Sequence, residues 1–182
     1  MDERIDIWDS QGRPTGRTAL KSEAHRMGWC HPTIHVWFYS ESGRVLLQRR
    51  AADKDTFPGL WDVSVAGHMG AGENPVEGAI REVWEEIGLE VSPEELEPIG
   101  TFKAVHRHAG GLIDCEFHHT FLCRLQQPLS ALAPQVSEVA EIKLHPLFTL
   151  AEEVWGLARP RQYVPHGADY YRTVIREIRS RL

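Results

Sequence analysis

The sequence predicts an α/β (α+β) domain in which a few helices pack on a mixed β-sheet. Segments rich in β-branched and aromatic residues recur between short turns, as strands do. A glycine-rich loop in the middle of the chain leads into an amphipathic helix. A length of 182 residues, with 42% hydrophobic and 25% charged content, suits one globular core. We therefore expect a single domain over residues 1–182.

The first thirty residues predict a hairpin-like extension. An alternating segment at 4–8 precedes turn residues at 11–14, and the polar stretch 18–26 is weakly helical. Residues 31–39, a turn at 41–43 and an apolar run at 45–48 together predict a second hairpin. Residues 60–65 predict one further strand that runs straight into the glycine-rich segment 67–72.

The clearest helix follows this loop. Asn74 suits the N-cap, Pro75 fits the first turn, Glu77 completes a capping box, and Gly88 ends the helix. One apolar stripe recurs at helical spacing and comprises Val76, Ala79 or Ile80, Val83 and Ile87. This stripe must face a sheet or another helix, so the charged side chains are expected on the opposite face.

The second half of the chain alternates strands and helices. Residues 99–106 and 112–125 predict strands joined across 109–111, and residues 141–144 predict a short strand. Residues 149–155 and 169–182 predict helices, the latter at the C-terminus, with a surface connection over 156–167.

Charge and composition exclude several classes of partner. Twenty Lys and Arg residues against 26 Asp and Glu give a net charge of -6, so no positive field favours a nucleic acid polymer as the main partner. No segment approaches the roughly 20 apolar residues that span a bilayer, and the acidic N-terminus lacks the layout of a secretory signal. No membrane association is expected. A homodimer is the commonest soluble assembly, and the sequence leaves the oligomeric state open.

Cysteine usage favours a reducing cytoplasm. Cys30, Cys115 and Cys123 are an odd and sparse set that cannot form a full disulfide framework, and none lies in a CxxC arrangement. A cytoplasmic location is therefore expected.

The predicted central helix carries three carboxylates on one face. Glu82, Glu85 and Glu86 are three and four positions apart. Each like-charged pair costs roughly 0.2 to 0.5 kcal/mol on an isolated helix, and Arg81 offsets only part of this cost. A cation is therefore expected here, and carboxylate oxygens without nearby thiolates or paired imidazoles favour Mg²⁺ or Mn²⁺.

Acidic patches alone are usually solvated helix faces, but this one lies within a longer pattern. Gly67, five residues, Glu73, seven residues, then Arg-Glu-x-x-Glu-Glu-x-Gly-Leu ending at Leu89 resembles the Nudix box at every defined position. The resemblance implies a Nudix fold, a mixed sheet sandwiched between helices, that hydrolyses a nucleoside diphosphate linked to another group. It implies metal ligands at Glu82, Glu85, Glu86 and the Ala66 carbonyl, and structural roles for Gly67, Glu73, Arg81 and Gly88.

A broader resemblance, from about His25 to Glu116, points to the type I isopentenyl-diphosphate isomerases. It is carried by residues 46–50, Lys54, residues 58–61 and Gly67-His68. In that family, a metal is held by residues that resemble His25, His31, His68, Asp114 and Glu116. The chain departs from it at Ala66, where isomerases use a cysteine, because a methyl group cannot transfer the proton that isomerisation requires. Isomerases also tend to lose box glutamates that this chain keeps.

These resemblances predict a hydrolase on an isomerase-like frame, with Mg²⁺ or Mn²⁺ as cofactor and a small diphosphate as substrate. Glu116 is expected to be a metal ligand or the general base, with Glu82 as the alternative base and Glu85 also in the catalytic set. Four side chains are expected to contact the substrate, namely Arg50, Lys54, Arg49 and His68. Two alternatives remain, an isopentenyl-diphosphate isomerase and a non-catalytic module that binds a phosphorylated ligand.

Overall fold

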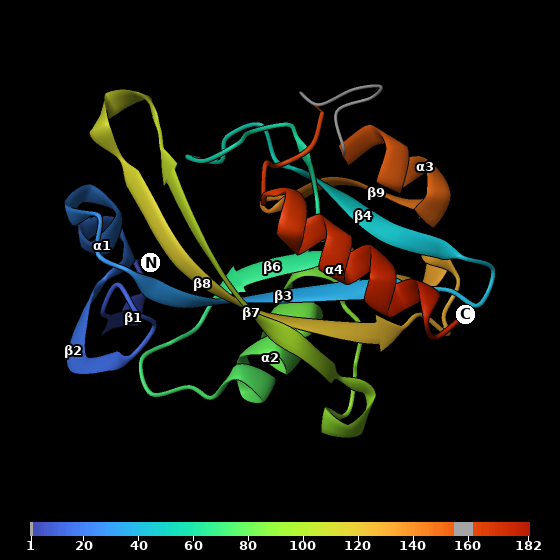
Figure 1. The fold of residues 1–182 in the computed structure, drawn as a ribbon, viewed down its shortest axis with the longest axis horizontal. Coiled ribbons are helices and arrows are strands. Elements are labelled where there is room, and N and C mark those ends of the chain that lie inside the picture. The colour runs from blue at the N-terminus through green and yellow to red at the C-terminus, as the bar shows by residue number, and fades with distance from the viewer. Residues whose placement is uncertain (1, 155–161) are drawn as a thin grey trace.

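The computed structural model describes residues 2–154 and 162–182 (Figure 1). Its N-terminal extension is a hairpin of β1 (Arg4–Trp8) and β2 (Pro14–Leu20), followed by α1 (Lys21–Met27). A small core of Ile5, Ile7, Ala19 and Ala24 holds these elements together. The extension therefore has the hairpin that the alternating sequence predicted.

The main sheet has seven strands, and β3 (His31–Tyr39) lies at its centre. The order is β5-β4-β3-β8-β7, with β6 paired to β3 and β9 paired to β4. The strands are β4 (Arg44–Arg50), β5 (Trp61–Asp62), β6 (Val65–His68), β7 (Glu97–Arg107), β8 (Ile113–Arg124) and β9 (Val139–Pro146). Because β3 and β8 are parallel while the other pairs are antiparallel, the sheet is mixed.

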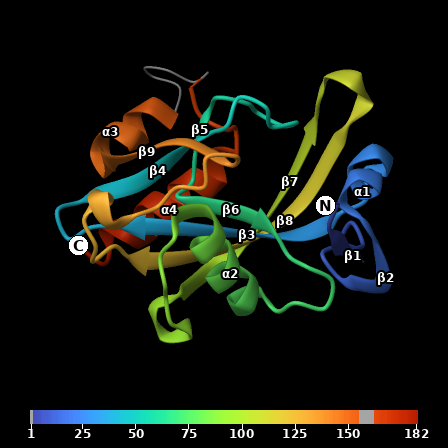
Figure 2. The same ribbon diagram turned by 180° about the vertical axis from the view of Figure 1, so that it is seen from behind.

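Helices cover both faces of this sheet (Figures 1 and 2). On one face, α2 (Pro75–Ile87) packs on Ile34, Val36 and Phe38 of β3. On the other, α3 (Leu147–Val154) and α4 (Ala168–Arg179) pack against Trp37 and Tyr39. Every residue of β3 is buried. The sandwich of a mixed sheet between helices confirms the predicted fold class.

Two predictions about the strands hold only in part. The predicted hairpin of β3 and β4 pairs only at Tyr39 and Val45, because the strands then diverge. The predicted strand over 60–65 is two short strands, of which β5 pairs with β4 and β6 pairs with β3. Ser64 lies between them, where its hydroxyl donates to the Leu46 carbonyl and accepts the Phe38 N–H. This side chain bridges the two diverging strands.

Helix α2 begins and ends as its sequence predicts. The Asn74 side chain accepts the N–H groups of Val76 and Glu77 at 3.0 Å, and the αL conformation of Gly88 ends the helix. The expected separation of apolar and charged faces is wrong, because Glu82 and Glu86 are buried with the apolar stripe.

The remaining elements largely match their predicted places. Three 3-10 turns lie at Pro93–Glu95, Ala109–Gly111 and Leu129–Ala131. The helix predicted over 149–155 is α3, but residue 155 and residues 156–161 of the predicted surface connection lie outside the described residues. The predicted C-terminal helix is α4. Among the described residues, no helix has the length and apolar character needed to cross a membrane.

A disulfide joins the extension to the sheet. Cys30, just before β3, pairs with Cys115 of β8, while Cys123 is a buried free thiol. The sparse cysteines did not predict this pairing, because their 85-residue separation hides the fact that β3 and β8 are neighbours. A disulfide is more typical of oxidising compartments than of the reducing one expected from the sequence.

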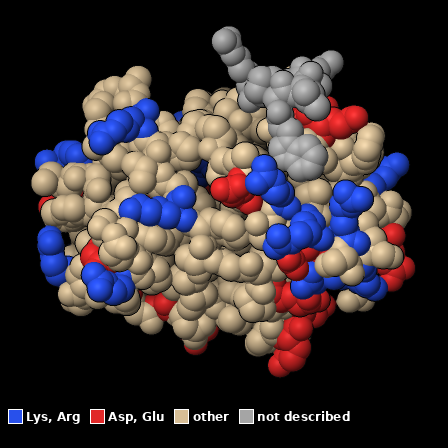
Figure 3. All heavy atoms as spheres, viewed as in Figure 1, with Lys and Arg blue, Asp and Glu red and all other residues tan. Residues whose placement is uncertain are grey.

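The surface carries charges of both signs. Lys and Arg side chains are interleaved with Asp and Glu on the face viewed in Figure 3.

Candidate functional site

A cavity of about 650 Å³ brings most of the predicted site residues together. Its lining includes the α2 carboxylates, His25 and His68, Asp114 and Glu116, and the cations Arg50 and Lys54. These residues come from α1, β4, β6, α2, β8 and the loop after β4. Packing of the sheet, the extension and α2 thus assembles one polar site from distant parts of the chain.

The loop before α2 is fixed to the helix by one arginine. Arg81 forms two bonds to Glu73, at 2.9 Å each, and donates to the His68 carbonyl at 2.8 Å. Glu73 also accepts the Gly70 N–H. A paired guanidinium and carboxylate hold a specific geometry. The structure thus places Glu73 and Arg81 where a brace between loop and helix requires them.

Arg81 also contacts two of the three α2 carboxylates. Its guanidinium lies 2.8 Å from Glu82 and 3.0 Å from Glu85. Glu85 is about half exposed, whereas Glu82 is buried. A Cβ on Gly67 would lie 2.0 Å from the Glu82 carboxyl carbon. Glycine at this position therefore makes room for the Glu82 side chain.

Glu86 lies deepest in the acidic group. It accepts the Ala66 N–H at 3.1 Å and the Gln48 side-chain amide at 3.0 Å. Ala66 thus contacts the group through its N–H. Burial and the charge of Glu82 raise the pKa of Glu86 to about 8, and burial raises the pKa of Glu82 to about 7 despite the nearby Arg81. A bound cation would stabilise both ionised carboxylates, so these donors fit a hard divalent metal.

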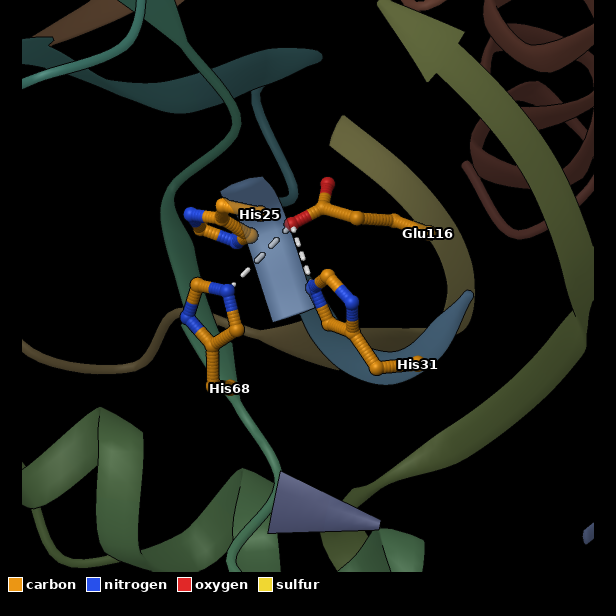
Figure 4. Close-up of side chains that lie close together, drawn as sticks. All are labelled: His25, His31, His68 and Glu116. Carbon is orange, nitrogen blue, oxygen red and sulfur yellow. Dashed lines mark ion pairs between the residues drawn. The ribbon is translucent and has the colours of Figure 1, made fainter. Parts of the chain in front are cut away.

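A second group lies around His68, the last residue of β6. It consists of three histidines and one glutamate (Figure 4). Glu116 Oε1 lies 3.6 Å from His31 Nε2 and 3.5 Å from His68 Nε2, and His25 completes the group. One ligand atom from each of the four residues lies within 4.8 Å of the others. Asp114 approaches His25 at 3.2 Å. The structure therefore assembles all five residues that the isomerase resemblance singled out.

Two of the three histidines are held in the uncharged form that can bind a metal. His31 Nδ1 bonds to the Trp29 carbonyl at 3.0 Å, which leaves its Nε2 directed at Glu116. Burial lowers the pKa of His25 to about 4 and that of His68 well below its ordinary value. Although burial opposes it, Glu116 raises the pKa of His31. Imidazole nitrogens beside a carboxylate are ligands that borderline transition metals accept.

The predicted substrate cations occupy different environments. Arg50 donates to the Thr56 carbonyl at 3.0 Å and pairs with Asp62 at 3.2 Å, and Lys54 pairs with Glu138. Both line the cavity. Arg49 points to the other face of β4, pairs with Glu141 at 3.1 Å and is not among the lining residues. The described structure therefore places Arg50 and Lys54, but not Arg49, at the cavity.

Sequence reasoning did not assign a third group in this cavity. His35, His118, His166 and Asp62 all line it. The sequence held a signal for two of them, because residues at even spacing on a strand point to the same face. His35 follows His31 on β3, and His118 follows Glu116 on β8, at such a spacing. Nothing in the local sequence marks His166 or Asp62.

Comparison with known proteins defines the family. The model of the NUDIX domain matches residues 29–177, which is most of the chain. The chain belongs to the Nudix family. A Nudix hydrolase of Clostridium acetobutylicum is 31% identical over 203 residues, with 97% of each chain covered. Nudix hydrolases generally use divalent metal ions and bind small-molecule substrates, and membership of the family implies a hydrolase.

Further relatives connect this Nudix domain to isomerases. The isopentenyl-diphosphate Delta-isomerase of Streptomyces griseus is 38% identical over 150 residues, covering 81% of this chain and 73% of that protein. Nudix hydrolase 3 of Arabidopsis thaliana is 36% identical over 149 residues, but this chain spans only 19% of its length. Both predicted resemblances are therefore confirmed.

Solved structures support the fold. The crystal structure of DR0079 from Deinococcus radiodurans superposes with a TM-score of 0.70 at 18% identity, covering 96% of this chain and 98% of that one. The Nudix fold is thus found in this chain despite low sequence similarity to that protein.

Proposed function

We propose that this Nudix domain hydrolyses a diphosphate linkage in a nucleotide or a related small metabolite, with Mg²⁺ or Mn²⁺ as cofactor. The supporting observation is the intact acidic group of Glu82, Glu85 and Glu86 at the wall of a cavity that Arg50 and Lys54 also line. Isomerases tend to lose these glutamates, so their presence here favours hydrolysis. The cavity thus combines donors for a hard cation with donors for phosphate oxygens.

Each residue has a role that follows from its environment. Mg²⁺ held by Glu82, Glu85 and Glu86 would neutralise phosphate charge and orient water toward phosphorus. Arg50 and Lys54 bind the phosphate oxygens. The fixed loop between Gly67 and Glu73 keeps the glutamates in place through Arg81.

Before a metal binds, the pKa values of the two carboxylates favour Glu82 over Glu116 as general base. A base works best when its pKa lies near the working pH, and the pKa of Glu82 is about 7. Burial opposes it, but His31, His118 and His68 hold the pKa of Glu116 well below its ordinary value. Glu116 is therefore better suited to hold a charge among these histidines than to accept a proton from water.

The test is a double variant, Glu85→Gln with Glu86→Gln, assayed with Mg²⁺ on several classes of diphosphate. The panel contains nucleoside di- and triphosphates, dinucleoside polyphosphates, nucleotide sugars, coenzyme A and isoprenoid diphosphates. The wild type is expected to hydrolyse at least one of them, and the double variant to lose that turnover. Glu90→Gln is the matched control, because this exposed glutamate lies just beyond α2 and outside the cavity. Turnover retained in the double variant would refute the proposal.

Isoprenoid diphosphate isomerisation is the second candidate. It is favoured by the Streptomyces relatives and by the group of His25, His31, His68 and Glu116. Ala66 disfavours it, because no thiol is available there for proton transfer. Incubation with isopentenyl diphosphate distinguishes the candidates, since the allylic isomer would be the product of an isomerase only. Tight binding of a panel compound without any product would instead favour a binding module.

A further inference from the structure

Three histidines meet on the side of the cavity that α4 covers. His35 lies on β3, His118 on β8, and His166 just before α4. The His35 and His118 rings stack with centroids 4.0 Å apart, and the His166 ring lies 4.8 Å from His35. One ligand atom from each ring lies within 4.8 Å of the other two. Two nitrogens bound to one zinc ion at about 2.0–2.1 Å lie no more than about 4.2 Å apart, so a small movement of the rings brings all three onto one ion.

Each ring has one nitrogen fixed by an oxygen of the protein. The pairs are His35 Nδ1 with the Tyr170 hydroxyl at 2.6 Å, His118 Nδ1 with Thr33 Oγ1 at 2.7 Å, and His166 Nε2 with Asp62 Oδ1 at 2.6 Å. Metal-binding histidines use the same arrangement, in which an oxygen bonds one nitrogen and orients the other toward the ion. The carboxylate of Asp62 is itself held by Arg50.

Two of the opposite nitrogens lack this support. His118 Nε2 and His166 Nδ1 are buried and form no hydrogen bond with any residue that the structure describes. His118 is 1% exposed and His35 is 3% exposed. A buried polar atom without a partner costs about 1–3 kcal/mol, and this group of histidines holds two such atoms. A shared ligand would remove both costs.

We propose that His35, His118 and His166 bind a transition-metal ion, with Zn²⁺ as the representative of its class. Nitrogen donors alone favour such an ion over Mg²⁺. Three histidines with one position open are typical of zinc sites that also bind a small ligand. Asp62 is the positioning residue, because it bonds His166 on the side away from the ion.

This centre shares no ligand with either group described above. Glu116 directs Oε1 at His31 and His68, and its Oε2 lies 3.7 Å from His118 Nδ1, the nitrogen that Thr33 already fixes. The proposal does not depend on the proposed hydrolysis. It would hold equally for an isomerase or a binding module, because it concerns metal content alone.

The test counts metal ions without any substrate. The full chain is freed of metal with a chelator, dialysed against Zn²⁺ and analysed for zinc per chain, and a parallel titration with Co²⁺ follows its visible absorption. His166→Gln is expected to bind one ion fewer than the wild type and to lose the corresponding part of the cobalt spectrum. Its amide can still donate to Asp62, so the wall of the cavity is preserved.

Two controls locate the lost ion. His145→Gln, a histidine paired with Glu153 outside the cavity, is expected to keep the wild-type metal content. His25→Gln affects the other histidine group. The zinc lost in His25→Gln should therefore add to the zinc lost in His166→Gln when both changes are combined in a double variant. Unchanged zinc content and cobalt spectrum in His166→Gln would overturn the proposal.

A second variant covers the case in which His166→Gln fails to fold. Asp62→Asn keeps the shape of the side chain and leaves all three ligands in place. It is expected to weaken one zinc affinity by about 10- to 100-fold, as loss of an outer partner does, while the number of sites stays the same. Equal affinities in Asp62→Asn and the wild type would overturn the proposal.

Discussion

Replacing Glu86 with glutamine should make the metal-free protein more stable at high pH. The amide oxygen can still accept the Ala66 N–H, as the carboxylate does at 3.1 Å. The pKa of Glu86 is raised to about 8 by burial and by Glu82, against an ordinary value of 4.5. The folded chain thus binds this proton more tightly than the unfolded chain does.

The sign of the effect follows from this difference. Below pH 4.5 Glu86 is protonated in both states, so its contribution to stability is fully present. As pH rises from 4.5 through about 8, the unfolded chain releases the proton first, and the free energy of unfolding falls. Each pKa unit corresponds to about 1.4 kcal/mol. Allowing half for relaxation and water entry around the carboxylate, we expect a gain of about 2 kcal/mol in Glu86→Gln at pH 9 and less than about 0.5 kcal/mol at pH 5.

Urea denaturation with a chelator at pH 5, 7 and 9 measures this gain. Glu90→Gln, which changes an exposed carboxylate, should follow the wild type at each pH. Adding Mg²⁺ should reverse the order at pH 9, because the wild type gains binding energy that Glu86→Gln cannot. A difference between the wild type and Glu86→Gln that is equal at pH 5 and pH 9 would refute the reasoning.

Three further changes test the surroundings of the site. Gly67→Ala would place Cβ 2.0 Å from the Glu82 carboxyl carbon. We therefore expect about 1–3 kcal/mol of destabilisation and a roughly 100-fold lower kcat/KM. Unaltered kinetics and melting would contradict this expectation. Glu73→Gln weakens the pair with Arg81 and should lower the free energy of unfolding by about 1–2 kcal/mol in urea melts, an effect that Glu90→Gln should lack. Cys30→Ser opens an 85-residue loop and should lower the free energy of unfolding by about 2–4 kcal/mol. A reductant should destabilise the wild type by the same amount. If a reductant leaves the stability of the wild type unchanged, the disulfide is excluded.

Features encoded by neighbouring residues could be predicted from the sequence. Asn74, Glu77 and Gly88 define the ends of α2 within one short segment, so the helix and its carboxylates were predictable. Pairing between distant strands was not. Between the diverging strands β3 and β4, Ser64 bonds both of them from a third segment. No local pattern reports such a bridge.

The same difference between neighbouring and distant residues decides which parts of the site could be predicted. Glu82, Glu85 and Glu86 were found because helical spacing places them together. The burial of Glu82 was not predicted, because it depends on the space that Gly67 leaves on the facing strand. The group of His35, His118 and His166 is drawn from three separate segments, so single-histidine reasoning missed it. Only the fold makes these histidines neighbours.

The parallel pairing of β3 with β8 has a consequence for how this scaffold can change. It sets His31 opposite Glu116 and Thr33 opposite His118, and a one-residue slip would turn the polar side chains of either strand to the other face. Main-chain pairing in the buried centre therefore aligns these ionisable groups. Segments 51–60 and 69–73 lie outside this ladder. Exchanging them with those of a relative should alter which molecules are accepted while leaving the alignment intact.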